Sequence, residues 1–216
     1  MTLESNKTIG GIGAILMFIG LIPYGEPFIG IIALVGLILV LVALYGFANI
    51  YNERGIFNNF IYGIIAGIVG GAITGIAVVV WVLTTLKNFL YQIYPGWNGD
   101  WSKLSGLTPN TSNITMSTVA PLIERLLLVF LILWIFIIIA AIFARRSIKT
   151  LSAKTSVGLF STAALLLLIG AILTIVLIGF LLMWIAVLLF AIAFFQVKPQ
   201  PEQPAPTMGP PPPTPV

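Results

Sequence analysis

Ionisable side chains are few in this chain, and they limit the chemistry that it can perform. The 216 residues include ten Lys or Arg, six Asp or Glu, and no His or Cys. Imidazole bases, thiolate nucleophiles, disulfides and the usual zinc or haem ligands are therefore absent. Asp100 is the sole aspartate, so the chain lacks the Asp pair or the Ser–His pair of an intramembrane protease. We expect no enzymatic activity, no cofactor and no metal ion.

Glu124 and Arg125 are the adjacent charges that could act together at a membrane site. They fall in the opening turns of an apolar segment that begins near Pro121. Burying an ionisable group in lipid is costly, so such groups mark transport paths or proton relays unless they reach the interface. The favoured interpretation is a charge pair at the membrane rim, with Glu124 near a helix start. A gating or binding pair is the alternative.

The elements that must position these residues are membrane helices. Apolar residues make up 59% of the chain and charged residues only 7%, and the mean hydropathy is +1.13. These values exclude an ordinary soluble domain. The apolar blocks predict six spans, at about residues 9–24, 28–50, 60–83, 121–144, 157–178 and 180–196. The fold class is therefore an all-α polytopic transmembrane helical bundle over residues 1–196.

The break between the last two spans is the least defined boundary. Residues 157–195 form almost uninterrupted apolar sequence, too long at roughly 58 Å for one straight crossing. We place the turn near Gly179, with Gly170 as a second candidate. A re-entrant arrangement, in which the segment folds back inside the membrane, stays open.

Basic residues indicate how the spans are oriented. With both termini cytoplasmic, the inner segments hold seven basic residues and the outer segments three, which agrees with the positive-inside rule. The outer loop is then residues 84–120. Two glycosylation sequons begin at Asn110 and Asn113 in that loop and would be usable only outside the cell. Such triplets also arise by chance in polar loops.

Four glycines in the third span form the most specific pattern in the chain. Gly63, Gly67, Gly71 and Gly75 recur every four residues and predict a smooth strip on one helix. Because lipid provides no hydrophobic drive for association, close backbone contact through small residues becomes a principal attraction. The favoured interpretation is a packing post within the chain's own bundle. The alternative is a homo-oligomer interface or a sliding contact.

Residues 197–216 differ from the rest of the chain. Pro210 to Pro213 form an unbroken proline run, and this composition predicts a disordered or polyproline II tail. The tail could bind a cytoplasmic protein partner or remain undocked. The net charge of +4 gathers at the inner membrane rim, where it meets anionic lipid, so we expect no nucleic-acid partner.

Two short segments carry a family resemblance. The opening Lys7-Thr8-Ile9-Gly10-Gly11-Ile12-Gly13-Ala14-Ile15-Leu16 and the closing Ala191-Ile192-Ala193-Phe194-Phe195 resemble the ends of a family of small archaeal membrane proteins. That family is catalogued as domain of unknown function nine hundred ninety-six. The resemblance implies an archaeal multi-pass membrane protein and transfers no activity or functional residue.

The function predicted from these features is non-enzymatic. We expect an integral multi-pass protein of the cell membrane, surrounded by membrane lipid, with a structural or interaction role. The alternative is a small transporter or channel subunit acting as an oligomer. That alternative needs polar sites at mid-membrane depth, which this chain could form only from unwound glycine segments or between copies.

Overall fold

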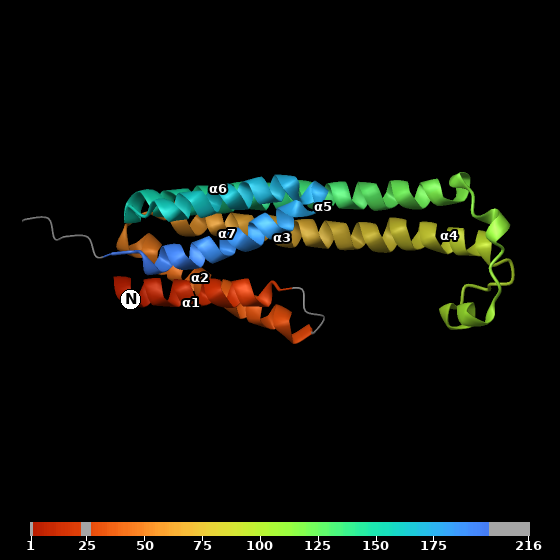
Figure 1. The fold of residues 1–216 in the computed structure, drawn as a ribbon, viewed down its shortest axis with the longest axis horizontal. Helices are drawn as coiled ribbons and strands as arrows, with labels where there is room; N and C mark the ends of the chain where they lie inside the picture. Colours follow the sequence, from red (N-terminus) through yellow and green to blue (C-terminus); the bar gives the residue numbers. More distant parts are fainter. Residues whose placement is uncertain (1, 23–26, 199–216) are drawn as a thin grey trace, which may run out of the picture.

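Two long antiparallel helices organise the molecule. In the computed structural model, which describes residues 2–22 and 27–198, the first of them comprises α3 (Gly55–Ala77), the π-helical turn η1 (Val78–Val82) and α4 (Leu83–Ile93). The second, α5 (Met116–Thr155), returns along it. At 1.5 Å per residue the two are about 58 Å and 60 Å long. They form a hairpin that runs the whole length of the molecule (Figure 1).

Two shorter hairpins lie beside one end of this pair. One consists of α1 (Leu3–Gly20) and α2 (Pro27–Ile50). The other consists of α6 (Gly158–Leu173), the short 3-10 turn η4 (Thr174–Val176) and α7 (Ile178–Phe195). Figure 1 shows both beside the lower-numbered part of α3 and the later part of α5. We call this end the bundle half.

The rest of the long hairpin extends beyond the short helices. We call residues 72–93 and 116–133, together with the connection between them, the projecting half (Figure 1). Its connection contains the short 3-10 helices η2 (Trp101–Gly106) and η3 (Thr111–Asn113). The side chain of Trp97 is buried there, and its ring lies 4.9 Å from Tyr91 and 5.2 Å from Trp101. This aromatic group packs against the end of α4.

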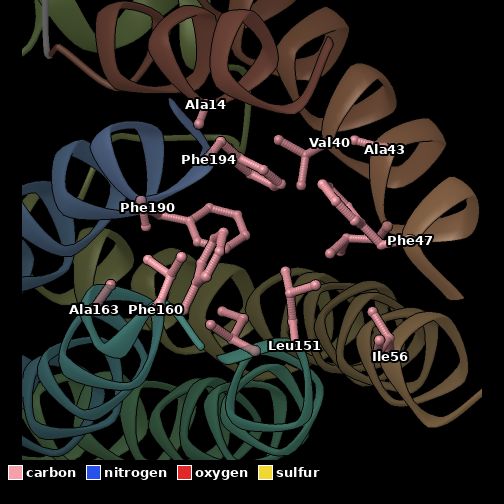
Figure 2. Packing of buried hydrophobic residues seen from close by; sticks show 14 of the residues in the cluster. Ala14, Val40, Ala43, Phe47, Ile56, Leu151, Phe160, Ala163, Phe190 and Phe194 are labelled. Carbon is pink, nitrogen blue, oxygen red and sulfur yellow. The ribbon is translucent and has the colours of Figure 1, made fainter. Parts of the chain in front are cut away.

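The core of the bundle half is built from phenylalanine and small residues. The Phe160 ring lies 5.6 Å from Phe190 and 5.2 Å from Phe194, in both cases edge to face, and Phe47 stacks on Phe194 at 6.0 Å. Figure 2 shows these rings converging from α2, α6 and α7, with Ala14 and Ala163 at their edge. Edge-to-face rings at these distances attract beyond simple contact. The helices α2, α6 and α7, with α1 through Ala14, are thereby joined around one apolar centre.

The all-α polytopic prediction is confirmed, although the number of spans is only approximate. Five helices in the described part of the chain are long and apolar enough to cross a membrane, against the six predicted. The helix α1 is not among them, because its first turns hold Glu4, Asn6 and Lys7. It begins at Leu3 rather than near residue 9, since the Thr2 hydroxyl accepts a hydrogen bond from the Ser5 amide.

The predicted outer loop of residues 84–120 is too long at both ends. The first long helix continues to Ile93, and α5 begins at Met116, where the Thr115 amide donates to the Thr118 hydroxyl at 3.0 Å. Polar residues there favour a loop, but α4 carries apolar residues along one side and packs against α5. The connection that remains is residues 94–115.

The last two spans also differ from the prediction. The chain reverses at Thr174–Leu177 and not near Gly179, and Leu177 takes a left-handed conformation with φ of 64°. Gly179 instead lies inside α7, where it packs against the backbone of Gly170 and Thr174. Both glycines named as turn candidates serve close helix packing. The predicted tail begins at residue 197, yet Val197 is fully buried, and residues 199–216 lie outside the described residues.

Candidate functional site: the open face of the long hairpin

The contact between α3 and α5 follows a seven-residue repeat. Ile56, Gly63, Gly70 and Ala77 are all buried on α3. A methyl group on Gly63 would lie 3.0 Å from the Ala140 carbonyl oxygen, and one on Gly70 would collide with the Phe136 side chain. Seven residues at 100° each fall about 20° short of two turns, so this row stays nearly straight along the helix. These small residues let the two long helices approach closely.

The four-residue glycine pattern leaves this contact. Each step of four residues turns about 40° further around the helix, so Gly67, Gly71 and Gly75 rotate progressively away from Gly63. All three are exposed, and a methyl group on any of them would have nothing within 4 Å. Among the described residues, Gly63 therefore contacts α5, whereas Gly67, Gly71 and Gly75 face away from it. Gly70, which the four-residue pattern omits, is the second contact.

Apolar side chains surround the three open glycines. Ile68 is 66% exposed, Ile76 65% and Val79 61%. On α5, the projecting half exposes Leu127 and Leu131. We define the open face as Gly67, Gly71 and Gly75 with Ile68 beside them. It is an apolar surface with a smooth glycine strip.

Glu124 and Arg125 lie on α5 near the end of the projecting half. Glu124 is exposed and Arg125 is half-buried. Consecutive residues on a helix point about 100° apart, so the two side chains leave α5 in different directions. The ion pairs in the described residues join Lys7 to Glu4, Lys103 to Asp100 and Lys154 to Glu53. The structure thus places the predicted pair together on the chain without forming an ion pair between them.

Comparison with known proteins gives this chain a family. Residues 32–188 match a family described as "Protein of unknown function (DUF996)". The chain belongs to this family. An uncharacterised protein of Methanocaldococcus jannaschii is 28% identical over 197 residues, covering 91% of this chain and 94% of the relative. No solved structure matches.

The part of this DUF996 chain that matches the family begins within α2 and ends within α7. It includes the whole long hairpin, the open face and the reversal at Thr174–Leu177. The resemblance drawn from the two ends of the sequence is confirmed at family level, although α1 and the closing Ala191–Phe195 segment lie outside the matched residues. Membership of this family assigns the chain to a class of proteins but indicates no chemical activity for it.

The two sequon asparagines have structural partners in the connection of the projecting half. The Asn110 carboxamide oxygen accepts from the Ser112 amide at 3.2 Å, and the Asn110 amide donates to the Ile93 carbonyl at 2.7 Å. The Asn113 side-chain nitrogen donates to the Gln92 carbonyl at 2.7 Å. Both residues are exposed and tie the connection to the end of α4. Their glycosylation stays a prediction.

The opposite end of the molecule carries most of the basic residues. Arg145, Arg146 and Lys149 lie on α5, and the Arg146 guanidinium lies 5.8 Å from the centre of the Phe143 ring. Lys154 pairs with Glu53 at 3.4 Å, which links the end of α5 to the connection after α2. The Ser147 hydroxyl donates to the Ile56 carbonyl. Nearby, burial raises the pKa of the Tyr51 phenol.

Two tryptophans that the sequence analysis did not single out connect the helices at mid-length. The Trp134 indole on α5 donates to the Ile172 carbonyl at 3.1 Å, and the Trp184 indole on α7 donates to the Phe18 carbonyl at 2.9 Å. Trp184 also stacks on Phe18 at 4.3 Å. Tryptophan in membrane helices concentrates at the membrane interfaces. A tryptophan in the middle of an apolar segment is therefore unusual, and this position is the feature of the sequence that could have pointed to Trp134 and Trp184.

Proposed function

We propose that this DUF996 protein is a non-enzymatic structural protein of the cell membrane that associates with a second copy of itself through the open face of α3. The observation that carries the proposal is the lack of any neighbour within 4 Å of a methyl group placed on Gly67, Gly71 or Gly75. Glycine strips let helix backbones come into contact in lipid, where such contact replaces hydrophobic drive. None of the residues that the structure describes covers the strip.

A second copy fits this face because the face is self-complementary. Two α3 helices related by a two-fold axis would place one glycine strip against the other, with Ile68 of each copy beside the contact. The surface holds no charge that a like surface would repel. The seven-residue row of α3 is already occupied by α5, so the same helix can hold its hairpin partner and a second copy at once.

Orientation in the membrane belongs to this proposal. The basic end, with Arg145, Arg146 and Lys149, lies at the cytoplasmic side, and residues 94–115 lie outside the cell. A cytoplasmic protein partner for the proline tail remains a separate prediction, because residues 199–216 lie outside the described residues. Transport is not favoured, since rings of Phe47, Phe160 and Phe194 fill the centre of the bundle half (Figure 2).

The experiment is a measurement of stoichiometry in lipid. Fluorophore-labelled protein is reconstituted at decreasing protein-to-lipid ratios, and the number of photobleaching steps per particle is counted. We expect the wild-type protein to form dimers, and Gly71→Leu or Gly67→Leu to yield mostly monomers that retain wild-type helix content. Ile65→Leu, on another side of α3, is the matched control and should remain dimeric. A wild-type protein that is monomeric at all ratios would overturn the proposal.

A further inference from the structure

The charges on α5 locate the bilayer on the long hairpin. Between Arg125 and Arg145 the helix holds residues 126–144 and no charge. These 19 residues span about 28 Å, close to the roughly 30 Å of a hydrocarbon core. The middle of this segment is Ile135. The bilayer midplane therefore crosses α5 next to Trp134.

The uncharged stretch of the partner helix is longer than a bilayer is thick, and its centre falls near the same level. On α3, η1 and α4 no charge occurs between Arg54 and Lys87, and its midpoint falls at Gly70 or Gly71. Gly70 packs against Phe136, one residue from the middle of the α5 segment. The uncharged stretches of the two long helices and the contact between Gly70 and Phe136 thus place the midplane at the same level. The long hairpin crosses the whole bilayer.

The hairpin of α6 and α7 ends at that same level. Trp134 donates its indole hydrogen to the Ile172 carbonyl at 3.1 Å, at the end of α6. The reversal that follows exposes Ile175, Val176, Leu177 and Ile178, with Leu177 69% exposed. The chain carries no charge between Lys154 and Lys198. An apolar tip without charge at mid-bilayer depth is surrounded by hydrocarbon.

Backbone groups at such a tip must find partners within the protein, because lipid provides none. The Leu177 amide donates to the Thr174 carbonyl at 3.0 Å, and the Phe180 amide donates to the Leu177 carbonyl at 3.2 Å. The buried Thr174 hydroxyl donates to the Ala171 carbonyl at 2.6 Å. Trp134 satisfies the carbonyl of Ile172, which is among the last four of α6 and so lacks a full helical partner.

The end of α1 uses the same arrangement at a similar depth. Trp184 donates to the Phe18 carbonyl in the last turn of α1, and Trp184 lies six residues, about 9 Å, below the start of α7. Gly20, the last residue of α1, packs against Ala33 of α2. The helix α1 therefore also ends short of the midplane reached by the α6–α7 tip.

We propose that the α6–α7 hairpin enters the membrane from the basic side and turns back at the midplane, so that the protein is a wedge with different cross-sections in the two leaflets. Of the described helices, α1, α2, α3, α5, α6 and α7 would pass through the leaflet on the basic side, and only the long hairpin would continue through the other. Because α2, α6 and α7 have 24, 16 and 18 residues, each is longer than one leaflet, so their far ends would extend beyond the hydrocarbon on the basic side. At interaxial spacings near 10 Å each helix occupies roughly 100 Å², which gives about 600 Å² against about 200 Å².

A protein of this wedge shape fits a curved membrane better than a flat one. Extra protein area in one leaflet is accommodated without crowding where that leaflet is the convex, expanded side of a curved membrane. The wedge therefore favours membranes that curve with the basic, six-helix leaflet outward. This preference follows from the depth of the short hairpins and does not require the dimer proposed above.

The first experiment measures the depth of the tip. The chain has no cysteine, so single-cysteine variants report one position each. In sealed vesicles, we expect a membrane-impermeant maleimide to label Ser105→Cys from one side and Ser156→Cys from the other. Val176→Cys should stay unlabelled from both sides and become reactive only in detergent. Labelling of Val176→Cys from the same side as Ser105→Cys would show a full crossing and overturn the inference.

The second experiment measures the curvature preference. Ser156→Cys protein is reconstituted into vesicles of phosphatidylcholine with a minority of phosphatidylglycerol, extruded to a series of diameters, and labelled from outside. The labelled fraction should rise at least roughly twofold from the largest vesicles to the smallest, because the small-vesicle surface favours the basic end outward. Ser105→Cys, at the opposite end, should show the reverse trend. An orientation independent of diameter would overturn the wedge even if Val176 lies at the midplane.

Discussion

The bundle half and the projecting half share a composition and differ in how that composition is used. In the bundle half, Phe160, Phe194 and Leu151 are fully buried against helices from distant parts of the chain. In the projecting half, residues of the same kind such as Val79 and Leu127 are more than half exposed. Lipid is as apolar as a leucine side chain, so an apolar residue in a membrane does not need to be buried. The shapes of the side chains therefore decide which helices pack together. The bundle half has small residues and phenylalanine rings at its helix contacts, and this distinguishes it from the projecting half.

The largest expected contrast is between a buried and an exposed apolar side chain. Phe160→Ala removes a ring that contacts Phe190 and Phe194, and should lower the free energy of unfolding by at least about 2 kcal/mol. The loss should stay below the about 5 kcal/mol seen at the top of the range for soluble cores, because lipid can replace part of the contact. Leu127→Ala, at a side chain 62% exposed, is the control and should change it by less than about 0.5 kcal/mol. Steric-trap unfolding in bicelles measures the free energy of unfolding of both variants. Equal losses would contradict the expected difference between buried and exposed apolar side chains.

A neighbouring pair of glycines tests the boundary between the halves. Gly70→Leu forces a side chain into Phe136 of α5 and should destabilise the monomer by about 1–3 kcal/mol. Gly71→Leu meets open space, and should leave the monomer's stability unchanged or slightly raised because leucine is the better helix former. The same unfolding assay, at a dilution where the protein is monomeric, compares them. A destabilised Gly71→Leu monomer would mean that the open face is closed within one chain.

The tryptophan hydrogen bonds give an intermediate effect. Trp184→Phe keeps a ring beside Phe18 and removes the donor to the Phe18 carbonyl, which should cost about 0.5–1.5 kcal/mol. Trp81→Phe, at a side chain 39% exposed in the projecting half, is the matched substitution and should have no measurable effect. Amide hydrogen exchange near the end of α1 should quicken in the first variant alone. Unchanged exchange there would contradict the role assigned to this donor.

The smallest effect should come from the ion pair at the basic end. Lys154 and Glu53 are 3.4 Å apart, with side chains 43% and 38% exposed. Exposed pairs of this kind contribute little because solvent screens them, so Lys154→Met should lower stability by at most about 0.5 kcal/mol. That loss should vanish at high salt. A larger loss that persists in salt would show that charge, and not apolar packing, holds the bundle half together.

Periodicity in α3 shows what could be predicted from residue spacing and what could not. The glycines at 63, 67, 71 and 75 lie on one helix, and Gly63 packs against α5. The contact nevertheless follows the seven-residue row through Gly70 and Ala77. Both rows are present in the same sequence, and the crossing of α5 selects between them. A single helix carries no information on which of its faces a partner will meet.

The boundaries that failed have a related cause. Residues 84–93 contain Thr84, Lys87 and Asn88, which read as loop, yet α5 continues beside them and gives them a surface on which to remain helical. Gly179 was the expected turn because glycine breaks isolated helices. It lies instead where two backbones touch, and Leu177 makes the reversal. Tertiary contact outweighed local propensity in both places.

The sequence by itself determined that the chain is all-helical, that it belongs with membrane proteins, and where its basic residues cluster, since these follow from the counts and order of apolar and charged residues. Only the tertiary structure decided that four helices are short and two are long, that three glycines remain open, and that indoles of Trp134 and Trp184 satisfy carbonyls at two helix ends. The physical reason is that hydropathy measures preference for lipid over water. It does not distinguish a helix surface covered by lipid from one covered by another helix.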